Sequence, residues 1–126
     1  MISDTIDILD PYIINIGIEF VAKPASNVDK YAVLNRAIKV LAKNYETRFY
    51  IGEHLYISDI YSILKRTPGI LDVTKVKIVN KNTSQYSSTY FDVESNISPD
   101  GSYLIAPNNA IFEMKFPGVD IKGKIV

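Results

Sequence analysis

Cysteine and tryptophan are absent from the 126-residue sequence, and neither sign of charge prevails. Without cysteine, the chain cannot form disulfide bonds, thiolate metal sites or a cysteine nucleophile. Lysine plus arginine and aspartate plus glutamate each number 14, so the formal net charge is zero. A neutral chain has no general attraction to nucleic acid or to an anionic membrane surface. We therefore expect no nucleic-acid partner.

Long hydrophobic runs are also absent. No apolar stretch reaches the roughly 20 residues that a membrane-spanning helix needs. The segment from Met1 to Asp7 lacks the basic region and apolar region of a secretory signal. We therefore expect no membrane partner.

The residues that are present describe a globular chain, 47% hydrophobic and 22% charged. Its length is close to the commonest size of a single domain. Tyrosine occurs nine times. Because tyrosine combines an apolar ring with a polar hydroxyl, it suits half-buried positions and protein interfaces.

Two hydrophobic periods predict the first elements. Residues 12–23 alternate as in a half-buried strand, which Pro24 ends. The side predicted to be buried carries Tyr12, Ile14, Ile16, Ile18, Phe20 and Ala22, and the other side carries Asn15, Gly17, Glu19 and Lys23. From Lys30 to about Thr47, apolar residues recur at helical spacing.

A second, shorter helix is predicted with Ser58 as its N-cap and Thr67-Pro68-Gly69 as its end. Strands are then predicted over residues 70–79 and around residues 90–94. A hairpin is predicted from residues 103–106 and 111–116. The sequence therefore predicts an α+β fold in two layers, with two helices on one face of a mostly antiparallel sheet of four to five strands, in the order β-α-α-β-β-β.

Residues 1–118 are expected to form a single domain, and residues 119–126 a C-terminal tail. The tail has two interpretations. It is a frayed end, or it is a strand that completes a neighbouring subunit, because Ile121 and Ile125 alternate with lysines.

No pattern indicates a catalytic, cofactor or metal site. His54 is the single histidine and has no serine, cysteine or carboxylate partner at a characteristic spacing, so we interpret it as a turn residue. Asp92-Val93-Glu94 resembles the start of a calcium loop, but Ile97 stands where that loop needs glycine.

Two surface features are indicated. The basic residues Lys75, Lys77 and Lys81 are interpreted as a solvated face. The candidate interface residues are Tyr50, Tyr56, Tyr61, Tyr90, Ile121 and Ile125.

One stretch resembles a known family. Gly52-Glu53-His54-Leu55 leads through Ser58-Asp59-Ile60 into the short helix, and Pro68-Gly69-Ile70-Leu71-Asp72-Val73 opens the next strand. This order resembles the C-terminal part of the baseplate J-like proteins of contractile-tailed bacteriophages, and the resemblance extends over residues 12–79. Residues 111–123 are more loosely similar to the ends of the baseplate wedge subunits of large myoviruses. Because members of the family are several times longer, this chain is either a fragment of a longer protein or a short relative, and we expect a fragment.

The resemblance implies a structural virion protein and not an enzyme. It implies a wedge domain of the tail baseplate, assembled in the host bacterial cytoplasm, that mediates subunit association in the ring around the tail hub. The implied partners are the chain itself, as a homodimer or ring, and other baseplate proteins, with no small-molecule substrate. The alternative is a small-ligand or peptide-binding α+β module that uses the sheet edge and the tyrosines. A third hypothesis is an enzyme that uses His54 with Glu53 or Asp59.

Overall fold

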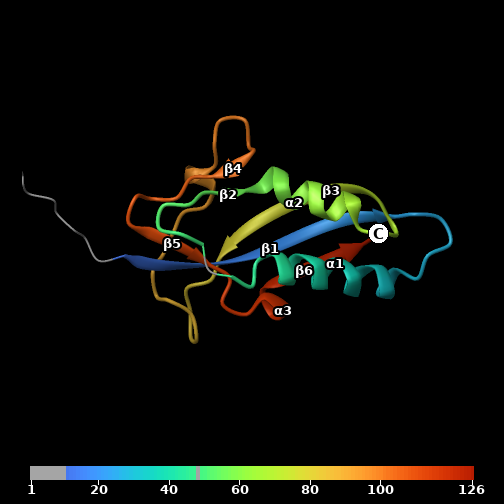
Figure 1. Ribbon diagram of the computed structural model, residues 1–126, viewed down its shortest axis with the longest axis horizontal. Coiled ribbons are helices and arrows are strands. Elements are labelled where there is room, and N and C mark those ends of the chain that lie inside the picture. Colours follow the sequence, from blue (N-terminus) through green and yellow to red (C-terminus); the bar gives the residue numbers. More distant parts are fainter. Residues whose placement is uncertain (1–10, 48) are drawn as a thin grey trace, which may run out of the picture.

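Strand β1 (Tyr12–Pro24) runs through the middle of the computed structural model, which describes residues 11–47 and 49–126 (Figure 1). The side that alternation predicts to be inward is buried at Ile14, Ile16, Ile18, Phe20 and Ala22. Every other strand of the main sheet pairs with β1. This one strand therefore organises the core.

Both edges of β1 are occupied. Its partners are β3 (Ile70–Asn80), β5 (Ala110–Glu113) and β6 (Ile121–Ile125). β3 runs antiparallel along one edge, while β5 and β6 run parallel along the other. The one-turn helix α3 (Pro117–Asp120) separates β5 from β6. A second, two-stranded sheet pairs β2 (Leu55–Tyr56) with β4 (Tyr103–Leu104) at one end of the molecule.

Helices α1 (Lys30–Asn44) and α2 (Ile57–Arg66) pack on one face of the main sheet, against β6 and β3 respectively. The Asp29 carboxylate caps α1 by accepting a hydrogen bond from the backbone N–H of Tyr31 at 3.0 Å. The buried stripe of α1 consists of Val33, Ala37 and Leu41. The α+β class is confirmed, and the order of elements roughly follows the prediction, with the two-residue strand β2 added between the two helices.

Ser58 is not the N-cap of α2, contrary to the prediction. The helix begins at Ile57, Tyr56 occupies the cap position, and no side chain caps it. Strand β2 runs directly into α2, and the Ser58 N–H donates to the Ser102 carbonyl at 3.1 Å. Pairing with the β4 segment therefore supplies the partner that a capping side chain would have supplied.

The predicted strand at residues 90–94 and the predicted hairpin do not form. The Phe91 N–H donates to Asn80 Oδ1 at 3.0 Å, and a 3₁₀ turn follows at Glu94–Asn96. After β4, a turn at Pro107 closed by the Ala110 N–H sends the chain to the edge of β1. β4 and β5 therefore pair with β2 and β1, and not with each other.

The predicted tail is part of the domain. Residues Ile121–Ile125 form β6 and pair with Ile18–Ala22 of the same chain. Both interpretations of this segment, a frayed end and an arm for a neighbouring subunit, are therefore wrong. The predicted domain boundary after residue 118 is wrong, because β6 of the same chain completes the main sheet.

The second face of β1 is covered along its first half, which alternation did not predict. Asn15 is buried, with Nδ2 donating to Glu113 Oε1 at 3.0 Å and Oδ1 accepting from the Ser87 N–H at 2.7 Å. Gly17 is buried because the backbone of Asp120 passes over it, and a Cβ there would lie 2.8 Å from the Asp120 carbonyl oxygen. The loop after β3 and helix α3 therefore form a partial third layer.

Asp120 ties these two covering segments together. Its buried carboxylate accepts hydrogen bonds from the Phe116 N–H and from the Tyr86 hydroxyl. Chiefly because of the hydrogen bond to this carboxylate, the pKa of Tyr86 is raised to about 12.

Candidate interaction surfaces

The predicted interface tyrosines do not gather in one surface. Tyr50 and Tyr56 lie near the small β2–β4 sheet, Tyr61 lies on α2, and Tyr90 lies in the loop after β3. Tyr50 is 81% exposed, Tyr56 47% and Tyr90 73%. Two of the predicted residues therefore share one end of the molecule, and Tyr90 lies apart beside β3 and Asn82.

The aromatic end, as we call Tyr50, Ile51, His54, Tyr56 and Tyr103, is built on the β2–β4 pair. The Tyr103 ring stands 5.2 Å from the His54 ring and 5.5 Å from the Tyr56 ring, measured between centroids. A turn next to this stack is closed by the Tyr50 N–H donating to Glu53 Oε1 at 2.8 Å. Ile51, which the prediction omitted, is 56% exposed in that turn.

Tyr61 has a role inside the fold. It is half-buried, and its hydroxyl accepts a hydrogen bond from the Val76 N–H at 3.2 Å. Val76 belongs to β3, whose outer edge has no strand partner in the described sheet. Tyr61 therefore satisfies one backbone donor of an edge strand.

Ile121 and Ile125 are core residues. Their exposed fractions are 1% and 9%, because β6 places both side chains in the hydrophobic core of their own chain. Their prediction as interface residues is wrong. The segment does form a strand, which was one of its two interpretations, but the strand pairs with β1 of the same chain and not with a neighbouring subunit.

His54 lies at the half-buried turn that the sequence indicated. Its Nδ1 accepts a hydrogen bond from the Ala106 N–H at 2.8 Å. This bond links the segment before β2 to the segment after β4. One ring nitrogen is therefore engaged by the backbone, and Tyr103 covers part of the ring.

The acidic residues of the 92–100 region act as turn caps. Asp92 accepts from the Ser95 hydroxyl at 2.6 Å, which lowers the pKa of the Asp92 carboxyl. Asp100 accepts from the hydroxyls of Ser98 and Ser102, which lower its pKa to about 2. Within residues 11–47 and 49–126, no three histidine or acidic side chains gather as a metal site.

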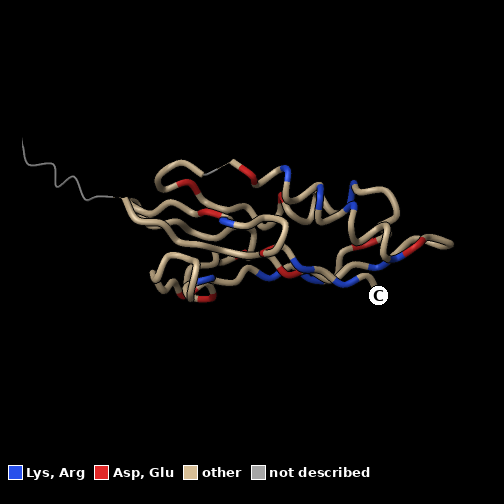
Figure 2. The backbone as a smooth tube through the Cα atoms, turned by 90° about the horizontal axis from the view of Figure 1, so that it is seen from below, with Lys and Arg blue, Asp and Glu red and all other residues tan. Residues whose placement is uncertain are grey.

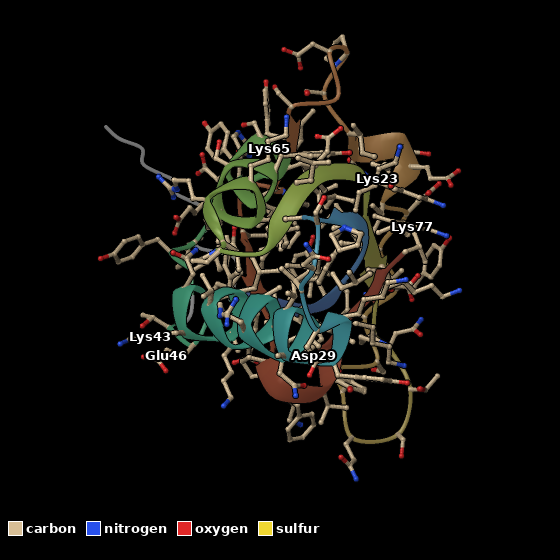
Figure 3. The ribbon with its side chains drawn as sticks, turned by 90° about the vertical axis from the view of Figure 1, so that its right-hand side faces the viewer. Lys23, Asp29, Lys43, Glu46, Lys65 and Lys77 are labelled. Atoms are coloured by element: carbon tan, nitrogen blue, oxygen red, sulfur yellow. The ribbon has the colours of Figure 1, made fainter. Side chains whose placement is uncertain are left out.

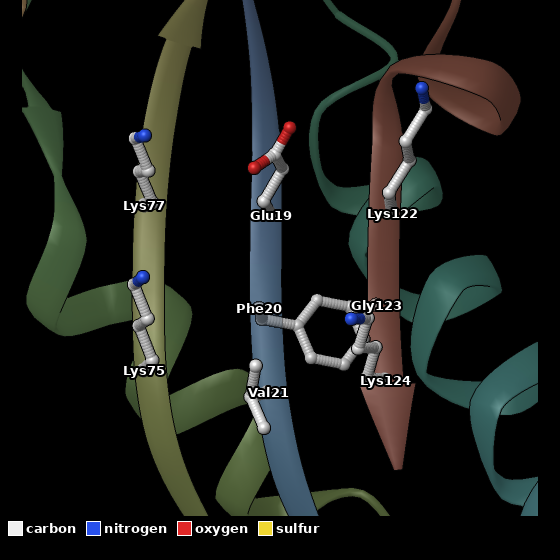
Figure 4. A pocket seen from close by; sticks show the side chains of 8 residues that line it. All are labelled: Glu19, Phe20, Val21, Lys75, Lys77, Lys122, Gly123 and Lys124. Carbon is white, nitrogen blue, oxygen red and sulfur yellow. The ribbon is translucent and has the colours of Figure 1, made fainter.

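The open part of the sheet carries a second surface, the lysine hollow (Figure 4). It is a depression of about 320 Å³ lined by Glu19, Phe20, Val21, Lys75, Lys77, Lys122, Gly123 and Lys124. In register, Glu19 stands between Lys77 and Lys122, and Val21 stands between Lys75 and Lys124. Four lysines thus surround one glutamate.

One side of this hollow was predictable from the sequence. Lys75 and Lys77 were predicted to lie on a solvated face, and the structure leaves both exposed. Lys122 and Lys124 were not predicted, because the last residues were not assigned to the sheet. The alternation of lysine with Ile121, Gly123 and Ile125 is the signal that points these lysines away from the core.

The part of the chain that the structure describes contains no helix with the length and apolarity to cross a membrane. No protein-family model and no curated protein matches this chain.

Proposed function

We propose that this chain is a structural, non-enzymatic domain of a contractile phage tail baseplate wedge, which associates through its aromatic end. The observation that carries the proposal is the exposure of three large side chains, Tyr50, Ile51 and Tyr56, within one seven-residue segment of a well-packed domain. Large aromatic side chains that remain exposed in a group are typical of protein interfaces.

Two further observations support the proposal. The resemblance to baseplate J-like proteins extends over residues 12–79, and every residue of the aromatic end except Tyr103 lies within that stretch. His54, the residue on which the enzymatic hypothesis depends, uses Nδ1 to hold the Ala106 backbone. The His54 ring therefore has a structural role, which is to hold the segment after β4.

Analytical ultracentrifugation over about 1 µM to 1 mM protein tests the association. We expect a concentration-dependent dimer or ring, and at least about a tenfold weaker association for the double variant Tyr50→Ser/Tyr56→Ser. The control Tyr31→Ser/Leu71→Ser removes two side chains that are 80% and 72% exposed elsewhere, and it should associate like the wild type.

A second experiment addresses the biological setting. An antibody raised against the domain should label the baseplate end of purified tails from the phage that encodes it. A monomer at every concentration that also fails to bind neighbouring tail proteins would refute the proposal. Labelling confined to another part of the particle would refute the baseplate assignment alone.

A further inference from the structure

The lysine hollow is a concentrated charge on a neutral chain. Its four lysines and one glutamate give a local net charge of three positive, whereas the whole chain has a formal charge of zero. Within the described residues, none of these five side chains forms an ion pair with another or with a neighbour. Figure 2 shows several Lys or Arg positions close together along one side of the backbone.

The lysines form a regular array because they occupy alternate positions on paired strands. Lys75 and Lys77 stand on β3, and Lys122 and Lys124 stand on β6, with β1 between the two strands. Within each strand the lysines repeat at about 6.6–6.8 Å, and the two lysine rows are about 10 Å apart. Val21 and Glu19 lie along the middle.

We propose that the lysine hollow binds an acidic, extended segment of a protein partner. An extended polypeptide carries its side chains with the same two-residue repeat as the lysines on a strand. Carboxylates at every second residue therefore match the spacing of the lysines. The Glu19 carboxylate accepts hydrogen bonds, and a polypeptide backbone offers N–H donors to it.

Other anions match the hollow less well. A single phosphate is small compared with an array whose lysine rows stand about 10 Å apart, so it would leave part of the array without a partner. Single-stranded nucleic acid is held by exposed aromatic rings on which bases stack, whereas the aromatic residue of the hollow, Phe20, is 2% exposed. A phosphodiester backbone also has no N–H to offer Glu19. This proposal does not depend on whether the chain is a baseplate protein.

Fluorescence anisotropy at about 50 mM salt tests the proposal with a labelled peptide of alternating aspartate and serine. We expect saturable binding that weakens as salt increases. A peptide with asparagine in place of aspartate, and a short oligothymidylate, should bind at least about tenfold more weakly. Equal binding of oligothymidylate would overturn the choice of a protein partner, and absence of acidic-peptide binding would overturn the site.

A pair of charge-matched variants locates the binding. Lys77→Glu/Lys122→Glu changes the hollow, whereas Lys39→Glu/Lys43→Glu makes the same net change on exposed positions of α1. Figure 3 shows Lys43 and Lys77 on opposite sides of the molecule. We expect at least about a tenfold loss of affinity for the first variant and less than about threefold for the second.

Equal losses in the two variants would show general charge attraction and would overturn the assignment to the hollow. Because the reversal at Lys77 and Lys122 adds carboxylates beside Glu19, Lys77→Gln/Lys122→Gln provides a milder second variant. Its affinity should fall by several fold while its circular dichroism stays that of the wild type. Unchanged affinity in this folded variant would also overturn the site.

Discussion

Gly123 faces the ring of Phe20 across the β1–β6 pair. A Cβ atom at Gly123 would lie 2.2 Å from Phe20 Cζ, well inside van der Waals contact. The Phe20 ring is 2% exposed and belongs to the core. The absence of a side chain at residue 123 is therefore a packing requirement of the sheet.

Replacement of Gly123 by alanine should lower the free energy of unfolding by about 1–3 kcal/mol, because the added methyl group displaces the Phe20 ring. Urea denaturation followed by circular dichroism measures this change. Gly118→Ala is the control, since its Cβ would meet nothing within 4 Å. Equal stability of the two variants would contradict the packing argument.

Tyr86 provides a pH-dependent test of the Asp120 contact. Its folded-state pKa is raised from 10.0 to about 12, so the neutral hydroxyl is favoured by the folded state. This contribution to stability is complete below pH 10 and is lost as the pH rises from about 10 to about 12. Burial raises the pKa of Tyr45 to about 12 as well, with the same sign.

We expect Tyr86→Phe to destabilise the domain by roughly 1 kcal/mol at pH 7, because the buried Asp120 carboxylate loses a donor. The variant should also lose less stability than the wild type between pH 10 and 12. Urea denaturation at several pH values gives both quantities, with the exposed Tyr90→Phe as control. An identical alkaline loss in Tyr86→Phe and the wild type would refute the assigned role.

The elements divide into those stabilised by their own sequence pattern and those stabilised by a distant partner. β1, α1, α2 and β3 are 10 to 15 residues long, and all four were predictable from the sequence. β2, β4, β5 and β6 are two to five residues long and exist because each pairs with a segment distant in the sequence. Such short strands have no periodic signal strong enough to identify their partners.

A core residue of β6 tests how much such a pairing contributes to the free energy of unfolding. Ile121→Ala should lower the free energy of unfolding by about 2–5 kcal/mol, because it leaves a cavity between β1 and α1. Val126→Ala, at a residue that is 62% exposed, should change it by less than about 0.5 kcal/mol. Comparison of the urea midpoints of the two variants checks this contrast. A small effect of Ile121→Ala would indicate that the C-terminal residues are a loose tail.

The candidate surfaces follow the same division. The exposure of Tyr50 and Tyr56 in and after a turn was predictable, since glycine and helix-start signals surround them. The lysine hollow was not, because its two sides come from residues 75–77 and 122–124. The two segments are brought together only by pairing with β1. Each local sequence pattern therefore includes only one side of the hollow.

At the scale of the whole molecule, β1 connects segments from the beginning, middle and end of the chain. We therefore expect one cooperative unfolding transition, with the same midpoint by far-ultraviolet circular dichroism and by tyrosine fluorescence. Folding should take milliseconds to seconds, because distant strands must meet before the core forms. Two separate transitions would show instead that the β2–β4 end unfolds independently.

The parallel pairing of β1 with β5 and β6 also determines how the domain responds to force. β1 begins at one end of the molecule, and β6 ends at the opposite end (Figure 1). A pull on residues 11 and 126 in opposite directions acts along the strands, so the hydrogen bonds of each pair are loaded together in shear. Shear requires several bonds to break at once, whereas peeling breaks them one after another. We therefore expect the domain to resist a pull along its long axis more strongly than a pull across its strands.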